Sequence, residues 1–295
     1  MSLAQTWTHW PAPAKLNLFL HIVGRREDGY HLLQTAFQLL DWGDDVRLRV
    51  RDDGEIRRTD PLPGVPDALD LGVRAAHALK LATGCRLGAD IAIEKRVPIG
   101  GGLGGGSSDA ATVLVALNAL WGTGLDEDAL TGIAIGLGAD VPVFVRGTSA
   151  WAEGIGERLT PLELPERWYV VVDPGVSVPT RELFQVPELT RNSPQLTIPL
   201  FVSGVPTGNA FEPVVRGRFP AVAKALDWLG RHGEAKLSGS GGAVFATVDS
   251  REAGEAILRE MPAVFRGWVV RGVNESPLRR RLAERHTDIG ASPSW

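Results

Sequence analysis

Hydrophobic and polar residues alternate strictly near the start of the chain, and this alternation predicts a β-strand. The even positions from 16 to 22 are all aliphatic, and the odd positions beside them carry Lys15, Asn17, Phe19 and His21. A period of two puts Lys15 and Asn17 on the same face of that strand. From 46 to 51, valine and leucine alternate with arginine, which predicts a second strand with one face in water.

Helical periodicity follows in three segments. In residues 70–81 apolar side chains recur three and four positions apart, and the pattern stops before Gly84. Residues 110–121 are apolar on most sides and predict a buried helix, whereas Asp126 can cap a helix that ends at Gly138. After it, the Val-Pro step that follows Asp140 is expected to leave helical geometry, because the residue before a proline disfavours it.

Strands and helices also mix in the second half of the chain. Strands are expected at 168–172, 243–248 and 268–273, and helices at 222–229 and 252–261. From about Leu282 onward the residues are polar and predict a tail. We find no internal repeat, so the pattern indicates an α/β or α+β fold with two domains, 1–155 and 156–295.

Composition agrees with two globular domains. The chain has 295 residues, of which 44% are hydrophobic and 22% are charged, which is enough for two cores. Its net charge of −4 argues against a dominant nucleic-acid-binding surface. None of the six histidines has metal-ligand spacing, so no protein metal ligand is assigned.

We expect no targeting signal. The one cysteine, Cys85, excludes an intrachain disulfide and suits a reducing compartment. No apolar run reaches about 18 residues, so no membrane span or membrane partner is expected. The first residues lack a basic region followed by an apolar one, so we expect no signal peptide and a cytoplasmic location.

A glycine-rich segment directly before residues 110–121 is the strongest chemical signal in the chain. Glycine allows positive φ and close backbone approach to a ligand, and serine and aspartate suit a helix N-terminus. Because the first turn of a helix has unpaired N–H groups and a partial positive charge, this segment predicts a phosphate site. It consists of Pro98, Ile99, Gly100, Gly101, Gly102, Leu103, Gly104, Gly105, Gly106, Ser107, Ser108 and Asp109.

Three nucleotide-binding interpretations of the segment compete. The Walker pattern fails because Ser107 stands where that pattern requires lysine. A G-x-G-x-x-G match exists at Gly100, Gly102 and Gly105, but no second strand with a terminal acid follows about 20 residues later. The third interpretation is the phosphate loop of another kinase class. A purely structural turn is disfavoured because six glycines lose much chain entropy on folding.

The other candidate residues indicate a catalytic or binding role only when they are considered together. Alone, Lys15 is typical of a surface lysine and Asp140 of a turn residue. Tyr30 and Phe184 are typical of core aromatic residues, and His31 is typical of a structural histidine.

Together these pieces resemble the GHMP kinase superfamily in three segments, which occur in the order of the family. The segments are residues 13–20 with 26–31, residues 98–111 with 138–142, and residues 237–242. The Asp-Gly-Tyr-His run within 26–31 resembles the members that phosphorylate a hydroxyl of a cytidine diphosphate-linked methylerythritol. The resemblance implies an α+β architecture, with an N-terminal domain related to ribosomal protein S5 domain 2 and a ferredoxin-like C-terminal domain.

The resemblance also implies residue roles, since phosphoryl transfer depends mostly on positioning and charge stabilisation. Asp140 is expected to accept the proton of the substrate hydroxyl, and Lys15 to stabilise the developing charge. Residues 98–109 and Lys95 are expected to bind ATP, with Mg²⁺ as its counter-ion. The cytosine is expected to stack between two aromatic side chains. The substrate-binding set is Asn17, Tyr30, His31, Thr180, Phe184, Gly239, Ser240 and Gly241.

Two positions depart from the family pattern: Ala210 stands where aspartate is usual, and Gly242 where serine is common. The expected partner is a small-molecule substrate only, for a chain that acts as a monomer or homodimer. Three alternatives remain at this point. They are a superfamily kinase for mevalonate or homoserine, a regulatory module that binds ATP without turnover, and a dinucleotide-dependent oxidoreductase. Lys15 and Asp140 argue against the module, because binding alone needs neither.

Overall fold

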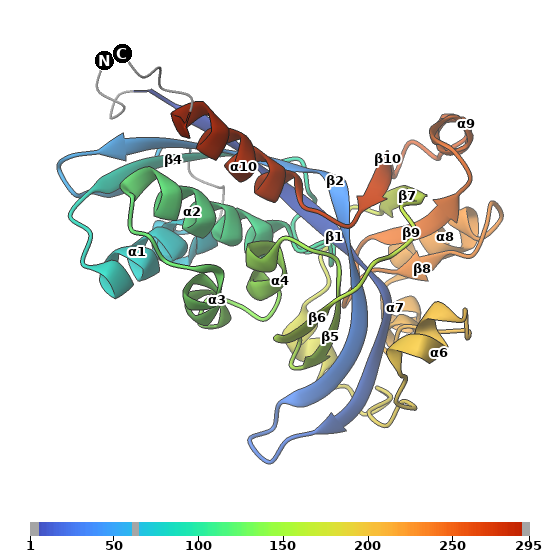
Figure 1. Ribbon diagram of the computed structural model, residues 1–295. Helices are drawn as coiled ribbons and strands as arrows, with labels where there is room; N and C mark the ends of the chain where they lie inside the picture. Colours follow the sequence, from blue (N-terminus) through green and yellow to red (C-terminus); the bar gives the residue numbers. More distant parts are fainter. Residues whose placement is uncertain (1–5, 61–64, 291–295) are drawn as a thin grey trace.

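Two long antiparallel strands run through the molecule and connect its two halves (Figure 1). The computed structural model describes residues 6–60 and 65–290. Strand β1 (Thr8–Arg25) pairs with β2 (His31–Arg51), and irregularities in the register bend this hairpin along its length. Both alternating segments of the sequence are thereby confirmed as strands.

The remaining strands extend from this hairpin on both sides. Strand β2 pairs with β4 and β10, and β7 pairs with β10, so that one sheet path crosses the molecule in the order β3, β4, β2, β10, β7, β9, β8. A short ladder of β5 and β6 pairs with the other half of β2. The bounds are β3 (Ile56–Arg58), β4 (Gly88–Glu94), β5 (Ala150–Gly154), β6 (Arg158–Pro161), β7 (Trp168–Asp173), β8 (Lys236–Leu237), β9 (Val244–Val248) and β10 (Arg266–Val273).

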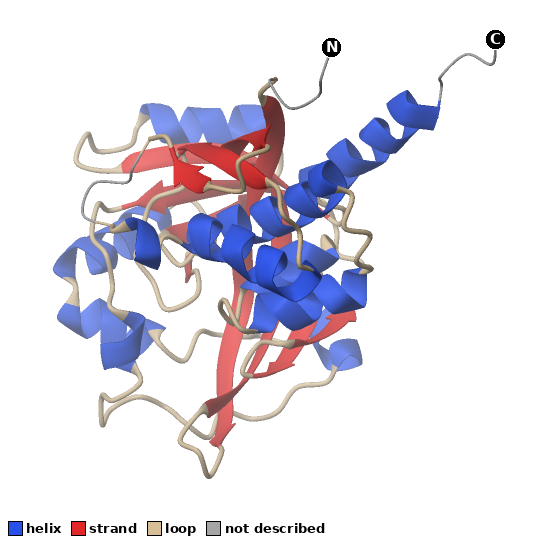
Figure 2. Ribbon diagram, turned by 90° about the vertical axis from the view of Figure 1, so that its left-hand side faces the viewer, coloured by secondary structure: helices blue, strands red, loops and turns tan. Residues whose placement is uncertain are grey.

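Helices of the first half pack on one face of the sheet, as Figure 2 shows from the helical side. Helix α2 lies at the centre of this layer and buries most of its side chains, as its sequence predicts. The bounds are α1 (Leu71–Thr83), α2 (Gly105–Trp121), α3 (Glu127–Ile135) and α4 (Val141–Arg146), with a short 3₁₀ turn at Asp67–Leu69. Helix α10 (Pro277–Gly290), from the C-terminal end of the chain, joins this layer against β1 and α2.

A second hydrophobic core forms in the other half of the chain. Its strands are covered by helices α8 (Pro220–Leu229) and α9 (Arg251–Arg259), and α5 (Thr180–Leu183) and α7 (Glu212–Arg218) add side chains to the same core. Helix α6 (Ile198–Val202) packs elsewhere, against Phe19 and Trp151. Leu20 and Ile22 of β1 belong to this second core, whereas Val273 and Leu278 belong to the first. The molecule is thus an α+β structure whose two largest hydrophobic cores lie in different halves, and a domain boundary at residue 155 stays a prediction.

The start of α2 differs from the expectation. The helix begins at Gly105 instead of Ala110, because Gly104 at φ +75° already turns the chain into the helix. Ser107, Ser108 and Asp109 therefore lie inside the first turns and do not cap them.

The prediction for the segment after Asp140 was wrong. Residues Val141–Arg146 form helix α4, with Pro142 in its first turn. Proline is tolerated there because a first-turn N–H has no helical acceptor to lose. The preceding helix, α3, is capped by Asp126 as expected but ends before Gly136 instead of at Gly138.

The expected polar tail is also wrong, since Pro277–Gly290 forms helix α10. Leu278 of this helix is buried against the first core, which gives the segment an apolar anchor. Among the residues that the structure describes, no helix is both long and apolar enough to cross a bilayer.

Candidate active site

One cleft of about 860 Å³ collects residues from both halves of the chain. It lies where the β1–β2 hairpin, the glycine-rich loop, the start of α4 and the loops near 180 and 239 come together. Most predicted site residues line it: Lys15, Asn17, Tyr30, His31, Gly100, Gly102, Gly104, Ser107, Asp140, Thr180, Phe184, Gly239 and Ser240.

Lys15 directs its ammonium group at three oxygen atoms. Its Nζ donates to Gly102 O at 2.9 Å and to Asn17 Oδ1, and it forms an ion pair with Asp140 Oδ2 at 3.3 Å. The side chain of Lys15 is 2% exposed, whereas that of Asp140 is 34% exposed. An ammonium has three protons, so each proton of Lys15 Nζ has one of these oxygen atoms as its partner. Asp140 therefore presents a carboxylate to the cleft beside a fixed positive charge.

Helix α4 leaves the carboxylate of Asp140 available. Asp140 is the residue before the helix, yet its side chain makes no capping hydrogen bond. One turn later, Phe144 packs against Gly104 of the glycine-rich loop, where a Cβ would lie 2.8 Å from the ring. This contact ties the position of α4, and so of Asp140, to the loop.

Alternate glycines of the loop have positive φ, with values of +73°, +74° and +75° at Gly100, Gly102 and Gly104. At Gly102 a Cβ would also overlap the carbonyl oxygen of Ser238, so no other residue fits without a shift of the backbone. The Ser238 hydroxyl in turn donates to Gly102 O at 3.1 Å. The loop is therefore packed directly on the second half of the chain.

The start of α2 leaves backbone N–H groups available to an anion. The first helical bond of this turn runs from Ser108 N to Gly104 O, so the N–H groups just before it have no acceptor within the helix. A second cavity, of about 350 Å³, adjoins this turn. It is lined by Lys95, Pro98, Ile99, Gly101, Leu103, Gly105, Gly106 and Asp109, among others.

Lys95 is held by two buried carboxylates. Its Nζ pairs with Asp109 Oδ2 at 2.7 Å and with Asp44 Oδ2. Burial raises the pKa of Asp109 to about 7, against the opposing effect of Lys95. Asp44 Oδ1 accepts the backbone N–H groups of Arg96 and Val97, at 2.5 and 2.8 Å. Lys95 thus anchors the entry to the glycine-rich loop, and its charge is already paired.

Asn17 connects the cation to the hairpin. Its Nδ2 donates to Thr35 Oγ1 at 2.9 Å, and the Thr35 hydroxyl donates to the carbonyl of Phe19. Its own backbone N–H donates to Ser238 Oγ at 3.3 Å. The amide group of Asn17 is therefore oriented from both strands, with its oxygen toward Lys15.

An aromatic pair lies at the end of the cleft near the hairpin turn. The rings of His31 and Phe184 are stacked, with centroids 4.7 Å apart and planes at 20°. Burial, together with the positive charges of Arg191 and Arg25, lowers the pKa of His31. Tyr30 is 61% exposed at the same end. A neutral imidazole and two flat rings suit a planar heterocyclic base.

Residues after β8 close the cleft from the second half. The hydroxyls of Thr180 and Ser240 are hydrogen-bonded to each other. Asn209 Nδ2 donates to Gly239 O at 2.7 Å and to Leu237 O at 3.0 Å, which fixes the turn. This turn also lies against the glycine-rich loop, since Ala243 N donates to Gly101 O at 3.0 Å.

Two predicted residues line neither cavity. Ser108 is fully buried in α2 and its hydroxyl has no protein partner. Gly241 packs against Leu237 and Val215 and shapes the turn. Gly242 is one of the two departures from the family pattern, and its φ of +92° favours glycine. A Cβ at this position would also lie only 2.9 Å from Gly100 O.

Sequence reasoning missed several residues of the cleft. Thr35, Phe37, Arg25 and Arg181 line it, and Arg191 contacts His31 from the loop after α5. No motif singles them out, because each reaches the cleft only through strand pairing or loop packing.

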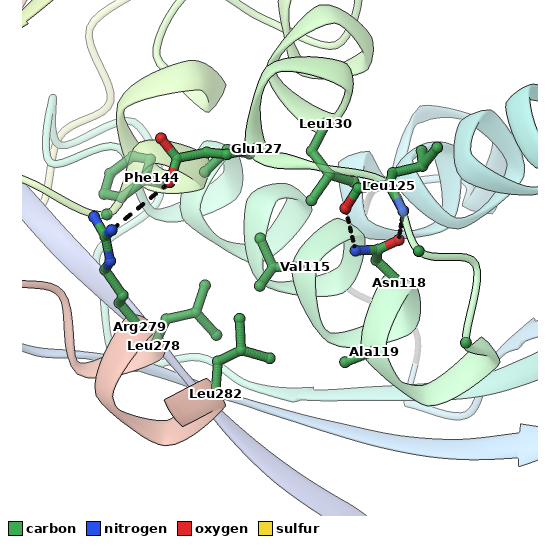
Figure 3. Close-up of a pocket in the computed structure, with 14 residues that line it drawn as sticks. Val115, Asn118, Ala119, Leu125, Glu127, Leu130, Phe144, Leu278, Arg279 and Leu282 are labelled. Carbon is green, nitrogen blue, oxygen red and sulfur yellow. Dashed lines mark hydrogen bonds and ion pairs between the residues drawn. The ribbon is translucent and has the colours of Figure 1, made fainter. Parts of the chain in front are cut away.

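A separate cavity of about 520 Å³ lies among α2, α3, α4 and α10 (Figure 3). Its walls are mainly apolar, and its polar groups are paired with one another. Asn118 exchanges two hydrogen bonds with the backbone of Leu125, and Arg279 lies 4.0 Å from Glu127. We therefore assign the chemistry to the cleft that holds Lys15 and Asp140.

Comparisons with known proteins identify the family. Residues 70–148 match the family model of the GHMP kinases N terminal domain, and residues 192–267 match that of the GHMP kinases C terminal domain. The chain belongs to the GHMP kinase family. Kinases of this family use ATP as phosphate donor, and the chain is accordingly an enzyme with the two-domain GHMP kinase fold.

Curated relatives cover nearly the whole chain. A 4-diphosphocytidyl-2-C-methyl-D-erythritol kinase of Halorhodospira halophila is 58% identical over 281 residues, which is 94% of this chain and 97% of the relative. A kinase of the same name from Xanthomonas axonopodis pv. citri is 59% identical over 273 residues, 92% of each chain.

Solved structures agree with the family assignment. A crystal structure of 4-(cytidine 5'-diphospho)-2C-methyl-D-erythritol kinase has a TM-score of 0.77 at 36% identity, covering 90% of this chain and 100% of that one. The homoserine kinase of Cytophaga hutchinsonii has a TM-score of 0.63 at 18% identity, covering 94% and 97%, and shares the fold.

Proposed function

We propose that this GHMP kinase transfers the γ-phosphate of ATP to the 2-hydroxyl of 4-diphosphocytidyl-2-C-methyl-D-erythritol. The products are the 2-phosphate and ADP, within the methylerythritol phosphate route to isopentenyl diphosphate. The observation that carries the proposal is the Lys15–Asp140 ion pair of 3.3 Å, in a cleft that also holds the glycine-rich loop and the His31–Phe184 pair. The names of the relatives supply the substrate.

The reaction assigned to this cleft is an in-line displacement at phosphorus. Asp140 Oδ accepts the hydroxyl proton as the substrate oxygen bonds to the γ-phosphorus, and the bond to the β-phosphate oxygen breaks. Lys15 stabilises the charge that develops on the transferred group. The N–H groups at the start of α2 hold the phosphates of ATP.

A divalent cation suits this arrangement without a site built from protein alone. Among the described residues there is no group of three or more histidine, cysteine, aspartate or glutamate side chains placed to hold a metal. Mg²⁺ bound through phosphates needs only one or two protein oxygens. The Ser107 hydroxyl, which lines the cleft at the start of α2, is the protein group that we propose would hold it. A Mg²⁺ ion held there would supply positive charge beside the phosphates.

The proposed roles at the other end of the cleft concern the substrate. Asn17 contacts the methylerythritol part, and the cytosine stacks between Tyr30 and Phe184, with His31 at its edge. Thr180 and the residues 239–241 close on the bound molecules from the second half.

A coupled ADP-release assay tests the proposal. The enzyme is mixed with Mg-ATP and the cytidine diphosphate-linked methylerythritol, and in parallel with mevalonate or homoserine. Release only with the cytidine-linked alcohol is the expected result. Release with another alcohol would keep the kinase chemistry and overturn the assigned substrate. ATP binding without release from any of them would favour a regulatory module.

A further inference from the structure

Arg191 is held rigidly by the loop that follows α5. Its two terminal nitrogens donate to four backbone carbonyls, those of Phe184 at 2.9 Å, Val186 at 2.7 Å, Leu189 at 3.1 Å and Pro187 at 3.4 Å. A planar guanidinium bonded in this way has one orientation. Its remaining donor, Nε, is therefore aimed in a fixed direction.

That direction is toward His31. Arg191 Nε lies 3.3 Å from His31 Nε2. Arginine can only donate, so Nε2 must be the acceptor and its lone pair must be free of a proton. A neutral imidazole bonded in this way carries its proton on Nδ1. In residues 6–60 and 65–290 no protein group bonds to that second nitrogen.

The same guanidinium places the aromatic partner of His31. It donates to the carbonyl of Phe184, whose ring stacks on the imidazole at 4.7 Å and packs edge-on against Phe211 at 5.0 Å. Arg25, the other nearby cation, donates from Nε to Gly29 O at 3.1 Å. The hydrogen bond to the imidazole of His31 therefore comes from Arg191.

We propose that Arg191 is a positioning residue that locks His31 as an Nδ1–H donor and thereby makes the cleft select cytosine over uracil. The inference rests on the proposed function, because it assigns base selectivity to that substrate site. Cytosine carries an acceptor at N3, which a fixed donor satisfies. Uracil carries N3–H instead, so two donors would face each other and one would lose its hydrogen bond.

The decisive experiment compares two substrates that differ only in the base. The kcat/KM of the wild-type enzyme is measured for the methylerythritol alcohol linked to cytidine diphosphate and for the same alcohol linked to uridine diphosphate. Arg191→Met removes the donor, and Arg191→Lys keeps the charge but loses the planar group. We expect both variants to lower the cytidine-to-uridine ratio by about tenfold or more. The KM for ATP should stay unchanged.

A matched control is Arg218→Met. Arg218 is a partly exposed arginine of the same half, paired with Glu188 at 3.5 Å, and it does not line the cleft. The ratio of kcat/KM for the cytidine-linked substrate to that for the uridine-linked substrate should be the same in Arg218→Met as in the wild type. If Arg191→Met slowed both substrates equally and kept the ratio, Arg191 would only hold the loop and the proposal would fail.

An independent readout is the tautomer of His31. Nitrogen-15 NMR of histidine-labelled enzyme should show an unprotonated Nε2 in the wild type, and a mixture of tautomers in Arg191→Met. A protonated Nε2 in the wild type would contradict the proposal that Arg191 holds His31 in the Nδ1–H tautomer. If the wild type released no ADP with the cytidine-linked alcohol, the proposed function itself would fall. The NMR result separates the two failures, because it needs no turnover.

Discussion

Lys15 Nζ lies 3.3 Å from Asp140 Oδ2, and the lysine is almost fully buried while the aspartate opens to the cleft. The other two acceptors of that ammonium, Asn17 Oδ1 and Gly102 O, come from β1 and from the glycine-rich loop. One cation thus joins the strand, the loop and the helix that carries the proposed base. Displacement of any of the three would move the positive charge away from the carboxylate.

Asp140→Asn should lower turnover by at least about a hundredfold, because the amide cannot accept the hydroxyl proton. The affinity for ATP should be unchanged, since the loop and the start of α2 remain intact. Steady-state ADP release and ATP titration measure the two quantities. Turnover close to that of the wild type would remove Asp140 as the base.

Tyr30→Ala should raise the KM for the cytidine-linked substrate much more than the KM for ATP. Tyr30 is 61% exposed and lines the cleft at the His31 end, so its ring is available to stack on a base. Leu81→Ala, at an exposed position of α1, is the control and should change neither constant. An equal loss of both affinities would assign Tyr30 to the fold.

Binding of the cytidine-linked substrate should weaken in acid with a midpoint below pH 6.5, the ordinary pKa of histidine. Burial and the charges of Arg191 and Arg25 lower the pKa of His31, so the neutral, Nδ1-protonated ring persists to lower pH than in a free histidine. Further acidification charges the ring next to both arginines, and the affinity should fall. In Arg191→Met the decline should begin at a higher pH, because one cation is gone. Calorimetric titration across pH 5 to 8 is the measurement, and a midpoint at or above pH 6.5 in the wild type would contradict it.

Gly102→Ala should abolish most activity and destabilise the protein by about 1–3 kcal/mol or more, because positive φ and a backbone overlap act together. Gly122→Ala is a matched control: its φ is +65° but no atom lies within 4 Å of a built Cβ. The control should cost about 1–2 kcal/mol in stability and keep activity. Denaturant unfolding measures the stability of the two variants, and ADP release measures their activity. If Gly102→Ala and Gly122→Ala lost equal stability and equal activity, the contact between residue 102 and Ser238 would be unimportant.

Asp109→Asn should change how stability depends on pH. Burial raises the pKa of Asp109 from 3.8 to about 7, so between these values the folded state binds more protons than the unfolded state. The free energy of unfolding of the wild type should therefore fall as the pH rises from about 4 to about 7. The variant should lack this component of the slope, which denaturant unfolding at several pH values tests. Parallel curves would mean that Lys95 keeps Asp109 ionised throughout this pH range.

Local patterns were reliable wherever one physical rule acted alone. Alternation predicted β1 and the shared face of Lys15 and Asn17, and helical spacing predicted α1, which Asp70 caps in the structure. The patterns failed where a competing rule acted. Pro142 was compatible with a helix because it lies in the first turn, and Leu278 anchors a helix in a polar segment.

The locally encoded chemistry could be predicted from the order of the residues: the glycines that permit positive φ, the helix that follows them, and the motifs that resemble the family. Which charged groups meet depends on how the chain folds. Lys95 is bound between Asp44 and Asp109, and Arg191 is aimed at His31, because strand pairing and loop packing bring together residues far apart in the chain. Hydrogen bonds act over about 3 Å, so a partner cannot be read from spacing once the chain between two residues folds back.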